Sequence, residues 1–187
     1  MTDEELVKGC VSKNALAQRL LFEKFSRRMM GICIRYANRT EEAEDMLQNG
    51  FIKVFDKIAS FRSEGSLEGW IRRIVINEAL TYLRQNKAMK FSVDINEAKY
   101  QIPSASDIAG IINEKDLLKI IQQLPLGFRT VFNMYAIEGF SHKEIADQLG
   151  ISEGTSKSQY SRAKIHLQNR LKTEMSSTNL ESDKKIN

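Results

Sequence analysis

Apolar residues recur at steps of three and four along most of this 187-residue chain. No run alternates apolar and polar residues, as a half-buried β-strand would. This spacing aligns apolar side chains on one face of a helix and therefore predicts an all-α fold. In the first long helix, from about 14 to 37, the residues expected to face a core are Leu16, Leu20, Phe22, Phe25, Met29, Ile32, Cys33 and Tyr36.

One stretch interrupts the helical pattern. Residues 87–112 show neither helical nor alternating periodicity, and both prolines, Pro103 and Pro125, lie within or beside the net acidic segment 91–123. We therefore expect two small helical domains joined by a flexible linker. The expected boundaries are 1–90 for the first domain, 91–112 for the linker, 113–173 for the second domain and 174–187 for a flexible tail.

The charge distribution favours an anionic partner. The chain holds 28 Lys and Arg against 24 Asp and Glu, a net charge of +4. The excess of basic residues lies in two segments, 61–90 and 124–172, and the segment between them is net acidic. Clustering of this kind is typical of surfaces that meet nucleic acid, although excesses this small do not decide it alone.

Several other classes of protein lack the residues that they need. The two cysteines, Cys10 and Cys33, form no CxxC pair and lie far in sequence from the two histidines, so we expect no disulfide framework and no metal site. The chain has no Gly-rich phosphate loop, nucleophile elbow or HExxH motif, so we expect no enzyme, no cofactor and no small-molecule substrate. The acidic start and the absence of an apolar run near ~20 residues favour a cytoplasmic protein.

The second half contains a helix-turn-helix signature. Ser141-His-Lys-Glu144 has the form of a capping box, and Gly150 stands where a short helix would end. A basic helix follows from Glu153 to about Lys172. A plain αα-hairpin in a bundle is the structural alternative. The outward face near the start of the basic helix is expected to hold short polar groups and an arginine that can reach base edges: Thr155, Ser158, Gln159 and Arg162.

Other apolar and polar stripes complete the expected helices. After Pro125, the residues Phe128, Val131, Phe132 and Tyr135 are expected on one buried face. A helix from about 67 to 86 carries a polar stripe with spacings of four, four and three residues, namely Arg73, Asn77, Thr81 and Arg84. Trp70 falls on the apolar face of the same helix, so we expect it in the core rather than as a stacking platform.

Two sets of motifs resemble regions of the sigma-70 family. Ala43-Glu-Asp-Met-Leu-Gln48, Phe51-Ile-Lys-Val-Phe55 and Trp70-Ile-Arg-Arg-Ile74 are similar to region 2. Glu138-Gly-Phe-Ser-His-Lys-Glu-Ile-Ala146 and Leu149-Gly-Ile-Ser-Glu-Gly-Thr155 are similar to region 4. Two such regions with a short linker resemble the extracytoplasmic-function (ECF) class of bacterial sigma factors. The resemblance implies a subunit that brings core RNA polymerase to particular promoters and helps to open them.

The resemblance also implies roles for particular residues. Contact with the clamp coiled coil of the largest polymerase subunit is implied for Asp45, Gln48 and Asn49. Capture of the non-template strand at the minus-ten element is implied for the loop residues Arg62, Ser63, Glu64 and Ser66 and for the stripe residues Arg73, Asn77 and Arg84. Recognition of the minus-thirty-five element is implied for Thr155, Ser158, Gln159 and Arg162 at the bases and for Lys143, Lys157 and Lys164 at the phosphates.

The resemblance implies partners beyond promoter DNA and core RNA polymerase. Members of the ECF class are commonly held inactive by an anti-sigma factor, often one bound to a membrane. The main alternative is a helix-turn-helix regulator of the response-regulator output type, which needs a receiver domain with strands and a phosphoacceptor aspartate. A helical adaptor without DNA binding would leave the basic helix unexplained.

Five positions depart from the family pattern. Asn49-Gly50 stands where the family usually has an acid and then a larger residue. Ser156 replaces a usual valine on the inner side of the basic helix, and Gln159 replaces a usual arginine. Ile165 replaces a usual basic residue on the outer face.

Overall fold

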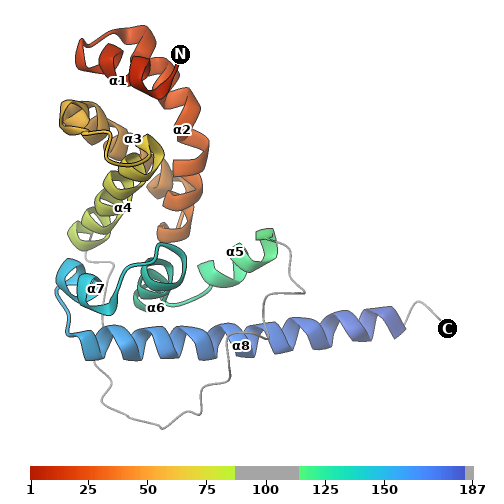
Figure 1. Cartoon of the computed structure of the whole chain (residues 1–187). Coiled ribbons are helices and arrows are strands. Elements are labelled where there is room, and N and C mark those ends of the chain that lie inside the picture. Colours follow the sequence, from red (N-terminus) through yellow and green to blue (C-terminus); the bar gives the residue numbers. More distant parts are fainter. Residues whose placement is uncertain (87–113, 184–187) are drawn as a thin grey trace. The chain divides into compact units, whose positions relative to one another are not determined.

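The computed structural model describes residues 1–86 and 114–183, including the side chains of 1–86 and 118–171. These residues form helices and turns without a strand, which confirms the all-α prediction (Figure 1). The chain divides into two compact units, Met1–Met89 and Lys90–Asn187. The linker expected at 91–112 lies outside the described residues. None of the described helices is long and apolar enough to cross a membrane.

Unit 1 is a bundle in which α2 contacts three neighbouring helices. Its elements are α1 (Asp3–Val11), α2 (Ala15–Tyr36), α3 (Thr40–Lys57), the 3₁₀ turn η1 (Ile58–Ser60) and α4 (Leu67–Gln85). Helix α2 packs against α1, α3 and α4, and α3 packs against α4. The bounds of α2 and α4 lie close to those predicted from the apolar spacing.

Helix α1 was not predicted, although the sequence holds a start signal for it. The Thr2 hydroxyl accepts a hydrogen bond from the Glu5 amide, and the Glu5 carboxylate accepts one from the Thr2 amide, which completes a capping box. Leu6 and Cys10, one turn apart, are buried. A Cβ on Gly9 would lie 2.4 Å from the Ala17 Cβ, so α1 and α2 meet at two small residues.

The predicted core of α2 is wrong at two positions. Leu16 is 60% exposed and Phe22 is 37% exposed, whereas Ala17 and Leu21 are buried. The buried stripe of α2 advances in regular turns from Ala17 through Leu21 to Phe25, and Leu16 and Phe22 lie beside it. Contact with α1, which apolar spacing in α2 does not reveal, determines which side faces inward at this end.

Gly50 accounts for one departure from the family pattern. It is buried in α3 where this helix crosses α4, and a Cβ at this position would lie 3.0 Å from Cγ2 of Val75. A larger residue would require Val75 to shift. The glycine therefore permits a close approach of these two helices at the expense of helix propensity.

The two cysteines are buried free thiols. Burial raises the pKa of Cys33 to about 12 and also raises the pKa of Cys10. Both groups stay protonated near neutral pH, and a protonated buried thiol is a poor nucleophile and a poor metal ligand.

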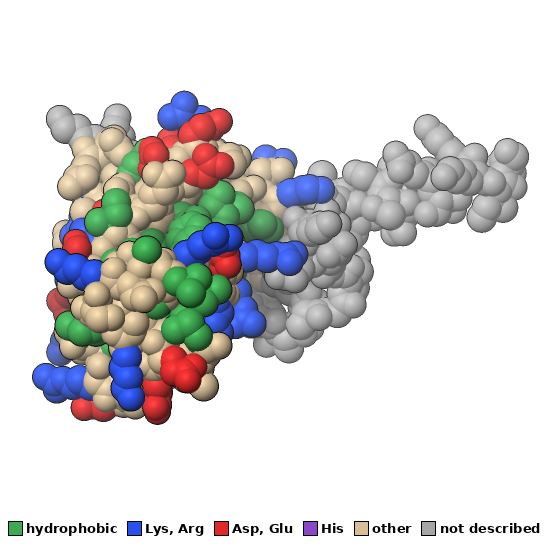
Figure 2. All heavy atoms as spheres, turned by 90° about the horizontal axis from the view of Figure 1, so that it is seen from above, with side chains coloured by type: hydrophobic (Ala, Val, Ile, Leu, Met, Phe, Trp, Pro, Cys, Tyr) green, Lys and Arg blue, Asp and Glu red, His purple; other side chains and the backbone are tan. Residues whose placement is uncertain are grey.

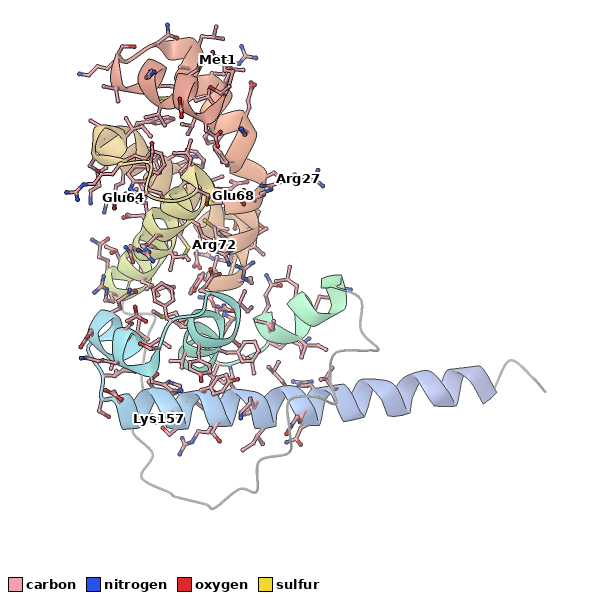
Figure 3. All side chains as sticks on the ribbon, in the orientation of Figure 1. Met1, Arg27, Glu64, Glu68, Arg72 and Lys157 are labelled. Atoms are coloured by element: carbon pink, nitrogen blue, oxygen red, sulfur yellow. The ribbon has the colours of Figure 1, made fainter. Side chains whose placement is uncertain are left out.

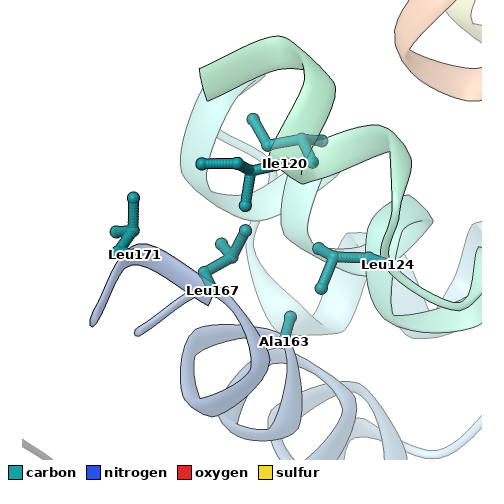
Figure 4. Packing of buried hydrophobic residues seen from close by; sticks show 6 residues of the cluster. Ile120, Leu124, Ala163, Leu167 and Leu171 are labelled. Atoms are coloured by element: carbon teal, nitrogen blue, oxygen red, sulfur yellow. The ribbon is translucent and has the colours of Figure 1, made fainter. Parts of the chain in front are cut away.

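Unit 2 contains the helix-turn-helix. Its described elements are α5 (Glu114–Gln122), α6 (Leu126–Phe132), the π-helical turn η3 (Asn133–Ile137), α7 (His142–Leu149) and α8 (Glu153–Asp183). Figure 4 shows α5 and α8 joined by an apolar cluster. The cluster contains Ile120, Ile121, Leu124, Ala163, Leu167 and Leu171, with Phe128 and Phe132 packed against it.

In unit 2, the exposure of Tyr135 and the end of α8 differ from expectation. Tyr135, expected on a buried face, is 38% exposed, because the wider π turn at Asn133–Ile137 rotates it relative to α6. Helix α8 continues to Asp183, so the tail expected at 174–187 begins within this helix.

Candidate polymerase and nucleic-acid interfaces

The outer face of α3 carries the three residues implied in polymerase contact. Asp45, Gln48 and Asn49 are exposed, on the side opposite to the buried residues of this helix. Ile52 is 57% exposed and lies one turn further along the same face. Nearby on α2, Phe22 packs edge-on against Phe51, with ring centroids 4.7 Å apart.

The exposed Ile52 and Phe22 were not predicted from the sequence. The available signal for Ile52 was its spacing of three and four residues from Asn49 and Gln48, which places it on the polar stripe of α3. Figure 2 shows one face of the molecule on which hydrophobic side chains gather among basic and acidic ones. Exposed apolar groups beside polar ones are typical of surfaces that bind another protein.

The loop between η1 and α4 encloses a pocket of about 520 Å³. All four loop residues named from the sequence are exposed: Arg62, Ser63, Glu64 and Ser66. The pocket is lined by Ser60, Phe61, Arg62, Glu64, Gly65, Ser66, Gly69, Trp70 and Arg73. Figure 3 shows Glu64 on this loop and Glu68 on the first turn of α4.

Local hydrogen bonding determines the shape of this loop. Ser63 has a φ of +57°, a left-handed conformation that turns the chain tightly. The Ser66 hydroxyl caps α4 by accepting a hydrogen bond from the Gly69 amide at 3.0 Å. The cap defines where α4 begins, and it thereby brings Trp70 and Arg73 of its first two turns to the pocket.

Trp70 does not lie in the core, so this prediction is wrong. Its indole is half-buried and lines the pocket, with its ring centroid 5.6 Å from that of Phe61. Phe61 supports one part of the indole, and the pocket leaves another part accessible. The apolar periodicity of α4 could not distinguish these placements, because Trp70 lies at the edge of the buried stripe that Leu67 and Ile71 form.

The polar stripe of α4 is exposed as predicted at Arg73, Asn77 and Arg84. Arg84 donates a hydrogen bond to the Thr81 hydroxyl, which in turn donates to the Asn77 carbonyl. These bonds hold the stripe on the outer side of the helix. Two ion pairs connect α4 to its neighbours in the bundle. Lys53 of α3 pairs with Glu78, and Arg28 of α2 pairs with Glu68.

The helix-turn-helix forms through the caps predicted from the sequence. The Ser141 hydroxyl accepts from the Glu144 amide, and the Glu144 carboxylate accepts from the Ser141 amide at 2.8 Å. Gly150 ends α7 in the left-handed conformation, with φ +67°. The Ser152 hydroxyl then accepts from the Thr155 amide at 3.0 Å and starts α8.

The side chains on α7 and α8 differ in exposure. Lys143, Lys157 and Ser158 are exposed, and Thr155, Arg162 and Lys164 are half-buried. Lys157, labelled in Figure 3, lies 3.8 Å from Glu153 of the preceding turn. The Lys164 ammonium lies over the Tyr160 ring, 4.9 Å from its centroid. Five of these six residues lie on α8, and a set of basic and hydroxyl side chains on one helix can contact both phosphates and base edges.

Gln159 is the exception, and its predicted outward placement is wrong. It is only 2% exposed, and its Oε1 atom has no hydrogen-bond partner among the described residues. Gln159 lies at the border between the outer and the inner stripe of α8. It is four residues after Thr155, on the outer side, but it is also three residues after the buried Ser156 and four before the buried Ala163. Helix packing places it on the inner side, so it cannot reach a base from this position.

Comparison with known proteins agrees with this organisation. The family model of Sigma-70 region 2 matches residues 21–89, and that of Sigma-70, region 4 matches residues 114–167. The chain is 28% identical over 174 residues to the RNA polymerase sigma-H factor of Pseudomonas aeruginosa, covering 87% of this chain and 90% of that protein. It is 26% identical over 183 residues to the ECF RNA polymerase sigma-E factor of Haemophilus influenzae, covering 91% of this chain and 96% of that protein.

A solved structure has a similar fold. It is the sigma factor RpoE in complex with the anti-sigma factor NepR from Bartonella quintana, with a TM-score of 0.51 and 24% identity. The similarity covers 82% of this chain and 96% of that chain. The two matched family regions together span more than half of the 187 residues, one in each unit and in the expected order. The chain therefore belongs to the sigma-70 family.

Proposed function

We propose that this chain is an ECF-type sigma factor that binds core RNA polymerase and directs initiation at promoters with particular minus-thirty-five and minus-ten elements. The observation that carries the proposal is the ordered pair of sigma-70 regions, each on its own compact unit. The chain is not an enzyme, because a sigma factor leaves the chemistry of RNA synthesis to the core. Its place of action is the cytoplasm, where bacterial DNA is transcribed.

Helix α3 docks on the clamp coiled coil of the largest polymerase subunit. Asp45, Gln48 and Asn49 supply polar contacts on this face, and the exposed Ile52 supplies an apolar one. A mixed surface of this kind suits a partner that binds and then dissociates, because the apolar area is too small to demand permanent burial.

The loop and α4 hold the non-template strand of the minus-ten element. Moving a base out of the DNA stack costs a few kcal/mol of stacking free energy, so the site that receives the base must replace these contacts. The pocket offers an aromatic face from Trp70 and polar groups from Glu64 and Arg62. Arg73, Asn77 and Arg84 then follow the phosphates along α4.

Helix α8 enters the major groove of the minus-thirty-five element. Thr155, Ser158 and Arg162 are the proposed base contacts, and Lys143, Lys157 and Lys164 are the proposed phosphate contacts. Gln159 is omitted because it is buried. Phosphate contacts release counterions, so DNA affinity should fall steeply with salt, whereas discrimination between sequences should depend on the base contacts.

The proposed partners also include an anti-sigma factor, by analogy with the complex of RpoE and NepR. The response-regulator alternative is not favoured. It requires a receiver domain with strands, and the described part of unit 1 is helical and matches sigma-70 region 2.

Transcription in vitro tests the proposal. Core RNA polymerase is incubated with fragmented genomic DNA, with and without the chain, and transcript 5′ ends are mapped. We expect a set of start sites that appears only with the chain and shares two upstream elements. An active core that gains no specific start sites would contradict the proposal.

A further inference from the structure

A hydrogen bond joins the two helices of the helix-turn-helix. His142 is the first residue of α7, and Ser156 lies on the inner side of α8. The His142 Nδ1 atom lies 2.9 Å from the Ser156 Oγ atom, which is a good hydrogen-bond distance. Ser156 is 0% exposed, so its hydroxyl has left water entirely.

Aromatic contacts hold the imidazole in one orientation. The His142 ring stacks on Tyr135, with centroids 4.2 Å apart and planes 11° apart. The Tyr160 ring lies 6.0 Å from the imidazole and 4.6 Å from Tyr135. The backbone of His142 is tied by the Ser141 capping box. The imidazole therefore meets Ser156 with little freedom to turn.

A buried serine hydroxyl at this position needs a hydrogen-bond partner. Where the family usually has valine, Ser156 brings a polar group into a buried site. A buried hydroxyl without a partner is costly, whereas a satisfied hydrogen bond is directional and favours one relative placement of its two groups. Apolar contacts are non-directional, whereas this hydrogen bond favours one rotation of the first turns of α8.

We propose that the His142–Ser156 hydrogen bond positions α8 for reading the minus-thirty-five element. Ser156 lies between the proposed DNA-contacting residues Thr155 and Lys157, so a rotation of α8 about its axis at this point would redirect both. His142 and Ser156 act as positioning residues and need not touch DNA. The inference rests on the proposed function of α8.

The charge on His142 is part of this arrangement. Burial lowers the pKa of His142, nearby Lys157 lowers it further, and Glu153 partly opposes them. The other titratable groups that face the ring are Tyr135 and Tyr160. The neutral ring is thus favoured in the folded state, and near neutral pH it meets the Ser156 hydroxyl without burying a charge.

Four variants and a control test the inference. Ser156→Val removes the hydroxyl, Ser156→Thr retains it, His142→Phe removes the nitrogen but keeps a ring on Tyr135, and the double variant combines His142→Phe with Ser156→Val. Ser161→Val makes the same chemical change at a half-buried position of α8. The measured quantity is the ratio of transcripts from a promoter with an intact and with a scrambled minus-thirty-five element. Circular dichroism melting of each variant shows whether it is folded.

We expect Ser156→Val to lower this ratio about three- to tenfold, the loss of one hydrogen bond, and Ser156→Thr to restore it to within about twofold. His142→Phe should lower it similarly, and the double variant should be no worse than either single one. Ser161→Val should resemble the wild type.

Two results would overturn the inference. One is a wild-type ratio for folded Ser156→Val, and the other is a double variant whose loss is the product of the single losses. Both leave the proposed function intact, because the wild-type chain would still direct specific starts. A wild-type chain that directs no specific starts would overturn the proposed function and, with it, the positioning role.

Discussion

The two units differ in what their cores contain. In the described part of unit 1, the one buried charged or polar residue is Glu78, which pairs with Lys53. Unit 2 buries several such groups: Arg129, Thr130, Asn133, Ser156 and Gln159. Unit 1 thus presents its candidate DNA groups as exposed side chains on an apolar bundle, whereas unit 2 places buried polar side chains on and near the helix that we propose reads DNA.

This difference predicts how each unit should respond to substitution. Apolar packing is non-directional, so a change on the surface of unit 1 should affect the contact that it removes and little else. Buried hydrogen bonds are directional, so a change inside unit 2 should alter DNA reading from a distance.

The largest expected effect is on the stability of unit 1. Ile71 of α4 is 0% exposed, and Ile71→Ala should lower the free energy of unfolding by about 2 to 5 kcal/mol, through lost burial and a residual cavity. Urea denaturation followed by circular dichroism measures the loss. Ile74→Ala, at a half-buried position of α4, is the matched control and should cost less. Equal losses for the two variants would argue against an apolar core centred on Ile71.

The next effect concerns the pocket. Trp70→Ala should slow promoter opening about five- to 150-fold, which corresponds to ~1 to 3 kcal/mol for one stacked base. Trp70→Phe should recover part of the loss, and binding of core polymerase should be unchanged for both variants. Trp70 is the one tryptophan of the chain, so the difference in fluorescence between the wild-type and Trp70→Phe holoenzymes reports on the pocket. A single-stranded minus-ten oligonucleotide that left this difference unchanged would argue against stacking.

A third prediction concerns base readout by unit 2. Arg162→Ala should weaken recognition of one minus-thirty-five position by ~1 to 3 kcal/mol and leave the other positions unaffected. Binding of the holoenzyme to a panel of single-base promoter variants measures this. Equal weakening on every sequence would instead assign Arg162 to a phosphate.

Lys157 provides the contrasting case on the same helix. Lys157→Ala should weaken binding uniformly across sequences and reduce the slope of log affinity against log salt by about 1. Titrations at several salt concentrations give the slope. A sequence-dependent loss would place Lys157 at a base edge.

The smallest expected effect is a pH dependence of α7, which begins at His142. Because the pKa of His142 is lowered in the folded state, the unfolded chain binds this proton more readily. The contribution of His142 to stability is therefore complete above its ordinary value of 6.5 and is lost as the pH falls through the lowered pKa. Amide exchange in α7 should accelerate in acid for the wild type and less so for His142→Phe.

Strong local signals predicted much of the fold from sequence. The apolar spacing of α2 and α4, the Ser141 capping box and the Gly150 turn each depend on residues close together in the chain. The outward placement of Asp45, Gln48 and Asn49 also follows from spacing alone, because α3 has a wide polar face.

Placements that depend on neighbouring helices were not predictable in this way. Gln159 lies at the edge of two stripes, and only packing against the rest of unit 2 determines its side. Phe22 and Trp70 look like core residues in sequence, but α1 and the loop before α4 alter which face is covered. The π turn that exposes Tyr135 leaves no clear mark in the sequence.

The central claim is that the two units read two separate promoter elements. The most direct measurement uses one promoter identified with the wild-type holoenzyme, in which each element is mutated separately, and compares transcription by the wild type, Arg162→Ala and Trp70→Ala. We predict a crossed pattern. Mutation of the minus-thirty-five element should reduce transcription by Arg162→Ala less than it reduces transcription by the wild type, and mutation of the minus-ten element should do the same for Trp70→Ala. The effect of the other element should be unchanged for each variant. Equal changes in sensitivity to both elements for each variant would contradict the claim.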